Sequence, residues 1–559
     1  RLFQTTFFIE FLSRIGVHNY FLGYVNEVTP QYIRVHFPTS RLLQKFHHNG
    51  NCFAGGQVGS FIIIEGEENG FLARLTELTL PDSERKNLTE KAILEDESTF
   101  HPSGKAELLL SFDTFNPNIA KRTMGVYPHI GSKVYTCSDE LISSFVNEFG
   151  AKSTDSTVGS FGVLSPNQTP CDVSLDSLFG RHCAVLGTTG GGKSWTLAKL
   201  MEMVQSSTSN KVILIDATGE YAKLSNTQHC VIGMDTYFPY AQLSNSDFCF
   251  LFSEHSPNSS TVLCEAINTL RLHKTGKLDS LIKIGKNANE ILKIISNNIA
   301  DCYNADFDIS KLHAQIRNEC IQEKNGNYAE DSFKLGYCSH LMARVNLFLN
   351  NGTVKFAFGI GGQNSNLSIL GKIKQFIDSN NSILRIGFEH LSYDFAIREI
   401  IVDFIASQLL KDARKGSFKA SPVLLFIDEA HQFLNKRINA DDDTSFYLQG
   451  IELIAKEARK YGLFLCLSTQ MPRDIPLGVL SQMGAFVAHR LINDQDRKAV
   501  ESAASSANKT TLSFLPIMGA GEALLIGVDF PMPLLLKVGE PINKPQSDTP
   551  KLKKKDIKP

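Results

Sequence analysis

The sequence lacks three features that would narrow its function at once: a large net charge, paired cysteine motifs and a long apolar run. Its 56 Lys+Arg nearly balance its 58 Asp+Glu, which gives a formal net charge of −2. This balance excludes a histone-like protein that binds nucleic acid by bulk charge, but it leaves room for a local basic channel. With 42% hydrophobic and 20% charged residues over 559 positions, the composition also excludes disorder along most of the chain.

The cysteines indicate neither a metal site nor a disulfide framework. None of the 11 cysteines stands in a C-x-x-C pair, and Cys183 and Cys466 lie in apolar runs, as buried thiols do. No apolar run approaches the roughly 18 residues that a membrane-spanning helix needs. Glu10 and Arg14 interrupt the early apolar stretch, so it does not have the pattern of a secretion signal. We therefore expect a cytoplasmic protein in a reducing compartment, without a membrane span.

Residues 1–150 predict a small β domain. Short runs of β-branched and aromatic residues are separated there by Gly, Pro and Asn, and strands at this spacing favour a barrel or a sandwich. The charged stretch Ser83–Glu97 is predicted to be a solvated loop or helix within this domain. The runs that predict strands are Tyr32–Phe37, Val58–Glu65, Phe71–Leu80, Glu107–Phe112 and Lys133–Thr136.

From about residue 155 apolar runs alternate with helical stretches, which predicts an α/β core with a parallel sheet. Strands that are buried on both faces of such a sheet should be continuously apolar, as these runs are. The core is predicted over residues 155–225 and 380–540. Its strands are predicted at His182–Leu186, Val212–Ile215, Ile383–Phe388, Val423–Ile427, Phe464–Ser468 and Ala485–Leu491, with later short strands at Glu522–Gly527 and Pro533–Val538.

Residues 226–379 predict a mostly helical insertion between the two core segments. Apolar residues recur there at helical spacing: Ile284, Ile291, Leu292, Ile295 and Ile299. The polar, Gly-flanked segment Gln363–Asn366 is predicted to be a loop. The last residues, 541–559, are rich in Pro and Lys and predict a flexible basic tail. This tail is either simply solvated or a tether to nucleic acid or to a partner.

The strongest motif is Gly187-Thr-Thr-Gly-Gly-Gly-Lys193-Ser194, a full match to G-x-x-x-x-G-K-[ST]. It follows the apolar run Cys183–Leu186 and precedes the helical pattern Trp195–Val204, which is the context that a phosphate-binding loop requires. Its glycines let backbone N–H groups approach phosphates, and the helix N-terminus adds positive potential. Lys193 is predicted to contact the β- and γ-phosphates, and Ser194 to ligate Mg²⁺. The nucleotide is predicted to lie against Gly187, Thr188, Thr189, Gly190, Gly191, Gly192, Lys193, Ser194 and Trp195.

A second signal is Val423-Leu-Leu-Phe-Ile-Asp428-Glu429, an apolar strand that ends in two carboxylates. Alone, such a strand end is common and usually structural. Together with a phosphate-binding loop, it predicts that Asp428 holds Mg²⁺ through the water shell of the ion. Glu429 is predicted to polarise the attacking water, because a phosphoryl-transfer site mostly positions groups and neutralises charge.

Three further polar residues stand near predicted strand ends. Gln470 follows the strand Phe464–Ser468, so its amide would either sense the γ-phosphate and orient water or simply cap the next turn. Arg459 lies between a helix and that strand, and spacing alone assigns it no role. Arg181 precedes the strand before the phosphate-binding loop, where a surface salt bridge is the simplest interpretation.

Together these motifs resemble the HerA branch of the FtsK–HerA group of P-loop ATPases. Their order and spacing run through most of residues 155–540, and the N-terminal β domain is similar to the HAS-barrel that precedes the motor in this family. The segments that carry the resemblance are Gly180-Arg-His-Cys-Ala-Val-Leu-Gly-Thr-Thr-Gly-Gly-Gly-Lys-Ser194, Ile215-Asp-Ala-Thr-Gly-Glu-Tyr221, Leu425-Phe-Ile-Asp-Glu-Ala-His431, Ala458-Arg-Lys-Tyr-Gly462, Leu467-Ser-Thr-Gln470 and Gly519-Ala-Gly-Glu-Ala-Leu-Leu-Ile-Gly527.

The resemblance implies a RecA-like core that binds ATP and Mg²⁺ between the subunits of a homo-hexameric ring, with double-stranded DNA in the channel. By the same resemblance, Arg459 would be the finger that reaches a neighbouring subunit's γ-phosphate, and Arg181 would also approach the nucleotide. Asp216 and Glu220 match the family's D-x-x-G-E-Y element near the Mg²⁺ side of the site. An arginine supplied in trans would make hydrolysis depend on the assembled ring. Channel contacts to phosphates would carry no sequence preference.

The sequence departs from the family pattern at two places. Trp195 follows Ser194 where relatives carry a small or polar residue, and the helical insertion cannot be matched residue by residue. Pore-facing residues are therefore not transferred from the family. Lys436 and Arg437 are candidates for that role, with a solvated loop as the simpler interpretation.

Two functions follow from this resemblance. The first is a hexameric, ATP-driven translocase or helicase of double-stranded DNA that acts with a partner nuclease or other effector. The alternative is an ATPase ring that serves as a scaffold in bacterial anti-phage defence. It would assemble and regulate an effector, such as a nuclease or a sirtuin-like NADase, docked on the N-terminal barrel. A secretion ATPase that pumps peptide or DNA is a third function, which the absence of a membrane segment disfavours.

Overall fold

A computed structural model describes the chain over residues 20–30, 32–48, 51–53, 55–82, 100–113, 120–121, 125–138, 141–142, 145, 157–165, 169–253, 256–303, 305–361, 368–434, 448–504, 507, 509–530 and 532–546. The chain divides into two compact units. Unit 1 comprises residues 1–208 and 480–542, and unit 2 comprises residues 209–479 and 543–559. Four sequence predictions lie outside the described residues: the stretch Ser83–Glu97, the loop Gln363–Asn366, the pair Lys436 and Arg437, and the tail beyond residue 546.

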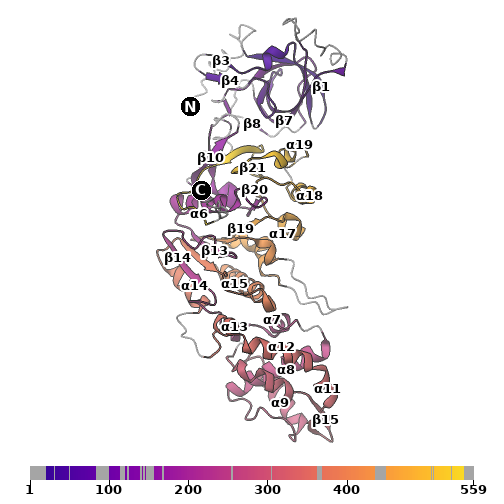
Figure 1. The fold of residues 1–559 in the computed structure, drawn as a ribbon, viewed down its shortest axis with the longest axis vertical. Helices are drawn as coiled ribbons and strands as arrows, with labels where there is room; N and C mark the ends of the chain where they lie inside the picture. The colour runs from indigo at the N-terminus through magenta and orange to yellow at the C-terminus, as the bar shows by residue number, and fades with distance from the viewer. Residues whose placement is uncertain are drawn as a thin grey trace, which may run out of the picture. The chain divides into compact units, whose positions relative to one another are not determined.

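Unit 1 begins with a closed antiparallel barrel, visible as a ring of strands in Figure 1. The strand order is β2-β1-β9-β5-β6-β7, and pairing of β2 with β7 closes the barrel. Buried residues alternate with exposed ones along β2, whose inward Ile33 and Val35 contribute to the core. The barrel strands are β1 (Phe21–Val28), β2 (Ile33–His36), β5 (Phe61–Ile64), β6 (Asn69–Thr79), β7 (Ser103–Asp113) and β9 (Lys133–Thr136). The short strand β8 (Ala120–Lys121) pairs with β7, and β3 (Phe46–His48) and β4 (Asn51–Phe53) form a separate two-stranded sheet.

A buried ion pair joins the barrel to the C-terminal part of unit 1. Arg74 on β6 lies 3.0 Å from Glu107 on β7, and both side chains are buried. The Thr511 hydroxyl, on the short helix α19 (Lys509–Leu512), donates to Glu107 at 2.8 Å. Arg74 also donates to the Pro533 carbonyl and lies 5.3 Å from the centre of the Phe514 ring. Burial lowers the pKa of Arg74, and the charge of Glu107 opposes this.

The remainder of unit 1 is a sheet of six strands in the order β11-β10-β22-β21-β20-β12. Neighbouring strands are antiparallel except β12 and β20, which run parallel. The loop after β12 leads directly into helix α6 (Lys193–Ser207). The six strands are β10 (Val158–Leu164), β11 (Pro170–Ser174), β12 (Cys183–Leu186), β20 (Ala485–Ala488), β21 (Glu522–Gly527) and β22 (Leu534–Val538), and helices α5 (Leu175–Phe179) and α18 (Asp494–Ala503) complete the unit.

Unit 2 contains a fully parallel sheet in the order β19-β18-β13-β17-β14. Because parallel strands end at one edge, the loops after these strands share that edge, which places polar residues there together. The strands are β13 (Lys211–Asp216), β14 (Thr227–Val231), β17 (Ile383–Gly387), β18 (Val423–Ile427) and β19 (Leu463–Thr469), and the helices nearby are α14 (Ile369–Asp378), α15 (Ile397–Arg414) and α16 (Gly450–Glu457).

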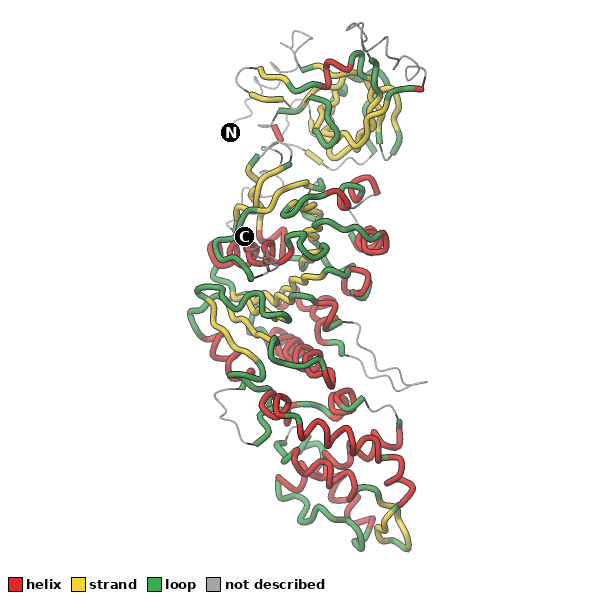
Figure 2. Tube along the Cα trace, in the orientation of Figure 1, coloured by secondary structure: helices red, strands yellow, loops and turns green. Residues whose placement is uncertain are grey.

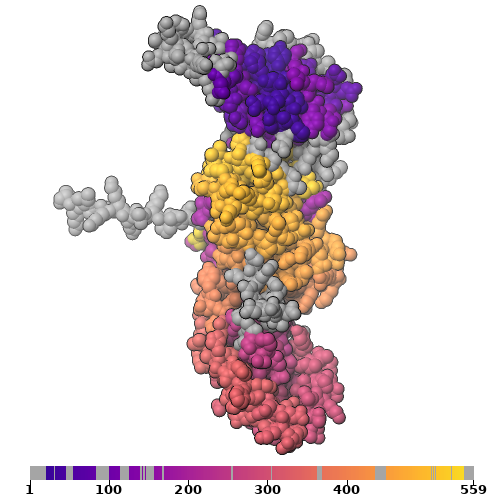
Figure 3. Space-filling model, turned by 90° about the vertical axis from the view of Figure 1, so that its right-hand side faces the viewer, coloured from indigo at the N-terminus to yellow at the C-terminus, as the bar shows by residue number. Residues whose placement is uncertain are grey.

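The rest of unit 2 is mainly helical, as Figure 2 shows in red, and a two-stranded hairpin stands among the helices. On the face shown in the space-filling view, the atoms of this part of the chain lie next to one another, in magenta to orange (Figure 3). Ile291 on α9 lies in a small core with Leu272 and Leu278, whereas Ile284 precedes the helix. The elements are α7 (Asn245–Leu251), α8 (Pro257–Lys274), α9 (Ala288–Asn298), α10 (Leu312–Asn318), β15 (Ile321–Lys324), β16 (Asn327–Glu330), α11 (Ser332–Tyr337), α12 (Ser339–Asn350) and α13 (Gly352–Ala357).

The predicted α/β fold with a parallel sheet and an N-terminal β-barrel is confirmed. Each of the six predicted core strands coincides with an observed strand to within a few residues at its ends. The edge strand β14 and the hairpin of β15 and β16, both within residues 226–379, are not among the elements predicted from the sequence. Within the described part of the chain, no helix is both long enough and apolar enough to span a bilayer.

Replacing Arg74 with Met should lower the free energy of unfolding of the chain by about 3–5 kcal/mol, because it leaves the buried Glu107 carboxylate without its cation. Denaturant-induced unfolding measures this change. The matched control is Arg34→Met, since Arg34 pairs with Glu27 at 3.0 Å on an exposed surface. This control should cost at most about 1 kcal/mol. Equal losses in the two variants would contradict a structural role for the buried pair.

Candidate nucleotide-binding site

The phosphate-binding loop of unit 1 follows β12 in a conformation that depends on glycine. Gly190 and Gly192 have φ angles of 72° and 116°, which side chains other than glycine rarely adopt. A Cβ on Gly190 would meet nothing within 4 Å, so the loop backbone faces open space there. Gly192 is the N-cap of α6, so the free N–H groups of the first helical turn begin at this loop. The loop therefore has the form that accepts phosphate oxygens.

Lys193 is the first residue of α6, and its side chain contacts the phosphate-binding loop. Its side chain is mostly buried, and its ammonium group donates to the Thr188 carbonyl at 3.4 Å. The Thr188 N–H in turn donates to the Arg490 carbonyl at 2.9 Å, which ties the loop to the segment after β20. Ser194 and Trp195 occupy the first turn of α6 and are partly exposed. The structure thus brings together all the predicted loop residues from Gly187 to Trp195.

In unit 2, Asp428 and Glu429 follow β18 at the carboxyl edge of the parallel sheet. The Asp428 side chain is buried, and burial raises its pKa to about 8. Burial is the largest cause of this rise; the carboxylates of Glu429, Glu220 and Asp216 contribute to it, and the Ser468 hydroxyl opposes it. Several acidic side chains are therefore gathered at this edge, and a bound cation would stabilise their ionised forms.

Glu429 is held in an uncommon backbone conformation. Its φ of 47° and ψ of 46° lie in the left-handed region, which costs about 1–3 kcal/mol for a residue other than glycine. His431 Nδ1 lies 3.3 Å from Glu429 Oε2 and 3.2 Å from the Thr469 hydroxyl. His431 thus connects the ends of β18 and β19. Gln470 follows Thr469 at the same edge.

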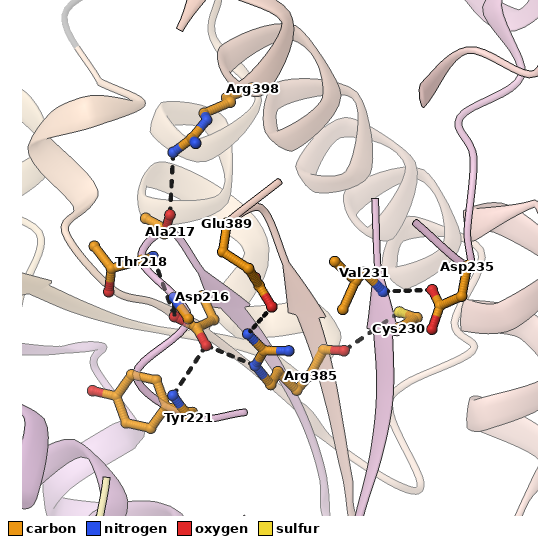
Figure 4. Close-up of polar contacts among 11 residues, drawn as sticks. Asp216, Ala217, Thr218, Tyr221, Cys230, Val231, Asp235, Arg385, Glu389 and Arg398 are labelled. Atoms are coloured by element: carbon orange, nitrogen blue, oxygen red, sulfur yellow. Dashed lines mark hydrogen bonds and ion pairs between the residues drawn. The ribbon is translucent and has the colours of Figure 1, made fainter. Parts of the chain in front are cut away.

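Asp216 at the end of β13 is hydrogen-bonded to the loop that follows it (Figure 4). Its carboxylate accepts hydrogen bonds from the N–H groups of Thr218, Gly219 and Tyr221 at 2.8–3.3 Å. The Arg385 Nε donates to the same carboxylate at 2.6 Å. Since the side chain is fully buried and these donors surround it, its placement supports a structural role. The position that the resemblance implies for Asp216, near the Mg²⁺ side of the site, stays a prediction.

Arg385 on β17 joins the ends of two strands through carboxylates. Besides Asp216, it lies 2.8 Å from Glu389, in the loop that follows β17 (Figure 4). Arg398 stabilises the same region, because it donates to the Ala217 carbonyl at 3.1 Å. Neither arginine was among the residues predicted from the sequence to form the site. A single charged residue inside the apolar run Ile383–Phe388 was the available signal for Arg385.

The two predicted arginines stand at the other ends of their strands. Arg181 precedes β12, whereas the phosphate-binding loop follows it, and its guanidinium pairs with Asp529 at 3.4 Å. Four strand residues span roughly 13 Å, so Arg181 is directed away from the loop of its own subunit. Arg459 is exposed on the turn before β19, at the end opposite Glu429. Within unit 1, the position of Arg181 does not support contact with phosphates at this loop.

The residues present fit a nucleotide with Mg²⁺. A Mg²⁺ ion usually keeps several waters and takes one or two protein ligands together with phosphate oxygens. Among the described residues, no cluster of three or more His, Cys, Asp or Glu side chains is arranged to hold a metal by itself. The buried Asp428 carboxylate and the Ser194 hydroxyl are oxygen donors of the kind that Mg²⁺ prefers. The raised pKa of Asp428 favours its protonated form, and a bound cation would shift this group toward the ionised form.

A glycine-rich loop before a helix, with two acidic residues at the end of a parallel strand, defines the P-loop ATPases, a class of ATP-hydrolysing enzymes. Two family models match the chain: "Helicase HerA, central domain" over residues 160–335 and "Helicase HerA-like C-terminal" over residues 408–547. Together they cover more than half of the sequence. The chain belongs to the HerA family.

Individual relatives are similar to the chain over most of its length. A probable helicase of Methanocaldococcus jannaschii is 27% identical over 428 residues, covering 74% of this chain and 75% of the relative. The DNA double-strand break repair helicase HerA of Sulfolobus acidocaldarius is 22% identical and covers 76% of each chain. Among solved structures, VirB4 of Thermoanaerobacter pseudethanolicus has a TM-score of 0.48 at 13% identity, covering 70% of this chain and 98% of that one.

Replacing Asp216 with Asn should destabilise unit 2 by about 2–4 kcal/mol, because an amide nitrogen cannot accept from Arg385 and the loop N–H groups. Hydrogen exchange should then accelerate at the amides of Thr218, Gly219 and Tyr221. Glu452→Gln is the control, since Glu452 pairs with Lys456 on the exposed face of α16. This change should stay within about 0.5 kcal/mol. Unchanged exchange in the Asp216 variant would refute the assigned role of this carboxylate.

Proposed function

We propose that the chain is an ATP-driven translocase or helicase of double-stranded DNA. The observation that carries the proposal is a HerA-family chain whose phosphate-binding loop has an open backbone and whose acidic strand end carries a buried Asp428 beside Glu429. The relatives named as helicases support the DNA substrate. Contacts to DNA phosphates would be independent of sequence.

Each site residue has a proposed role in this reaction. Backbone N–H groups from Gly187 to Ser194 bind the phosphates, and Lys193 contacts the β- and γ-phosphates. Ser194 and Asp428 would hold Mg²⁺, which when bound neutralises charge on the phosphate oxygens. Glu429 accepts a hydrogen bond from the attacking water and polarises it. Gln470 orients this water or senses the γ-phosphate.

We propose that the active form is a homo-hexameric ring in which Arg459 acts on the nucleotide of a neighbouring subunit. Its exposed position, at the strand end opposite the Glu429 of its own subunit, supports action in trans. Arg181 has the same kind of placement relative to its own phosphate-binding loop, so we propose an inter-subunit role for it as well. Charge neutralised at a subunit interface would link hydrolysis to assembly.

The proposed division of labour follows the predicted domains. Residues 1–150 would dock a partner effector, residues 155–225 and 380–540 would form the motor, and residues 226–379 would be an insertion in it. A nuclease or sirtuin-like NADase as the effector, and a role in bacterial anti-phage defence, remain predictions from the resemblance. The basic tail 541–559 also remains without an assigned role.

The direct test of the proposal measures ATP turnover with and without duplex DNA. We expect DNA of unrelated sequences to stimulate turnover equally, and stimulation to fall as salt rises. Glu429→Gln should still bind Mg-ATP but lose about 100-fold or more in kcat, whereas the exposed Glu452→Gln should match the wild type. Turnover that ignores DNA would reject the translocase, and normal turnover in Glu429→Gln would reject the assigned base.

Mixing two inactive variants tests the proposed ring. Lys193→Ala should not bind nucleotide, and Arg459→Ala should bind it but lose about 1,000-fold in kcat. In a mixed ring, the Arg459→Ala subunit supplies an intact phosphate-binding loop and the neighbouring Lys193→Ala subunit supplies an intact Arg459. Together they form a complete site, so activity should return. Native mass spectrometry with ATP should show a hexamer. Failure of the mixture to recover activity, although mixed rings form, would place Arg459 outside the neighbouring site.

A further inference from the structure

His489 lies beneath the phosphate-binding loop of unit 1, directly after β20. Its side chain is fully buried. A Cβ placed on Gly187 would come within 2.6 Å of the His489 Cβ, and one on Gly192 would come within 3.1 Å of its Cε1. The imidazole and the loop are therefore packed so closely that neither glycine has room for a side chain. The His489 side chain packs directly against the phosphate-binding loop.

Both ring nitrogens of His489 have defined partners. Nδ1 lies 2.8 Å from the Glu522 carbonyl oxygen, and Nε2 lies 2.8 Å from the Thr196 hydroxyl. A carbonyl oxygen can only accept, so Nδ1 carries the proton and Nε2 accepts from Thr196. Burial lowers the pKa of His489 to about 4, and the charge of Lys193 acts in the same direction, against the hydrogen bond to Glu522. The ring is therefore neutral near pH 7.

Main-chain contacts join His489 to the end of β12 and the segment before β21 to the loop. The His489 N–H donates to the Leu186 carbonyl at 2.7 Å, and the Gly521 N–H donates to the Gly191 carbonyl at 3.1 Å. The ring thus lies between three elements: the phosphate-binding loop, the first turns of α6 at Thr196, and the start of β21 at Glu522. A shift of any one of them would break a contact to this residue.

We infer that His489 is a positioning residue for nucleotide binding, whose ring holds the loop glycines and the start of α6 in the conformation that receives the phosphates. It acts through Thr196 and the loop backbone, not by contact with the nucleotide. Misplacement of a binding group by about 1 Å can reduce a rate about 100-fold, so a support of this kind affects function. The inference rests on the proposed nucleotide site at Lys193, and it does not depend on DNA translocation.

A purely structural role for His489 makes a different prediction. A buried histidine that only stabilises the core would lower the unfolding temperature when replaced, but folded variants would bind nucleotide as the wild type does. A positioning residue would weaken nucleotide binding in folded protein at temperatures well below unfolding. Affinity measured on folded variants therefore separates the two roles.

The experiment compares His489→Ala, His489→Gln and Thr196→Val in the full chain. Calorimetric titration with Mg-ADP gives the Kd, and the fluorescence of Trp195, which adjoins Ser194, reports the loop. We expect His489→Ala and Thr196→Val each to raise the Kd about tenfold or more. His489→Gln should recover much of this loss, because its amide oxygen can accept from Thr196. The effects of His489→Ala and Thr196→Val should not add in the double variant, since both remove one contact.

His273→Ala is the matched control. His273 Nδ1 also lies 2.9 Å from a carbonyl oxygen, that of Leu278, but in the helical part of unit 2. This variant should lose stability without a change in the Kd for Mg-ADP. Circular dichroism confirms that each variant is folded at the titration temperature, and Thr196→Val provides a milder test if His489→Ala does not fold.

Lys193→Ala separates this inference from the proposed function. If Lys193→Ala binds Mg-ADP as tightly as the wild type, the proposed nucleotide site itself is wrong. If Lys193→Ala fails to bind while folded Thr196→Val and His489 variants keep the wild-type Kd, the positioning role is wrong and the nucleotide site stands. Loss of affinity in His489→Ala with recovery in His489→Gln supports the positioning role.

Discussion

The ion pair between Asp216 and Arg385 is the interaction on which the acidic edge of unit 2 depends. The two residues lie on adjacent parallel strands, β13 and β17, and both side chains are buried. Buried charges of this kind are tolerated only when they are paired and hydrogen-bonded. Arg385 supplies the positive charge, and the loop N–H groups after β13 satisfy the remaining acceptor positions of Asp216. The pair therefore fixes how two strands end and where their loops begin.

This pairing also decides the electrostatics of the edge. Asp428, Glu429 and Glu220 gather near Asp216, and their mutual repulsion contributes to the high pKa of Asp428. Arg385 neutralises part of the negative charge at this edge, because it pairs with Asp216 and Glu389. Asp216 is already paired with Arg385. A bound cation would therefore stabilise the ionised form of the other buried carboxylate, Asp428. A structural carboxylate and a functional one are thus distinguished by their partners rather than by residue type.

The phosphate-binding loop of unit 1 requires positive charge, because it must attract negative phosphates. Lys193 and the N–H groups at the start of α6 supply positive potential. A protonated histidine beneath the loop would repel Lys193, and burial keeps His489 neutral instead. The barrel of unit 1 also contains a buried ion pair, between Arg74 and Glu107. Its partner Thr511 comes from the C-terminal segment, so the contact also links distant parts of the chain.

Features with a local physical requirement could be predicted from the sequence. The glycines of the phosphate-binding loop, the apolar parallel strands and the carboxylates after β18 all depend on neighbours within a few residues, and each lies where the sequence predicts it. The edge strand β14 escaped prediction, because an edge strand is only partly buried and Thr227-Gln-His-Cys-Val231 lacks the apolar run of a central strand.

The sequence by itself therefore determined the class of fold, the loop that would bind phosphates and the carboxylates after β18. Only the tertiary structure decided which side chains pair. Asp216 pairs with Arg385, 169 residues away, His489 with Thr196, 293 residues away, and Arg74 with Glu107, 33 residues away. The tertiary structure also showed that Arg181 stands at the far end of β12 from the loop. The reason is physical: local patterns fix how a segment folds, whereas strand order and burial fix which charges meet.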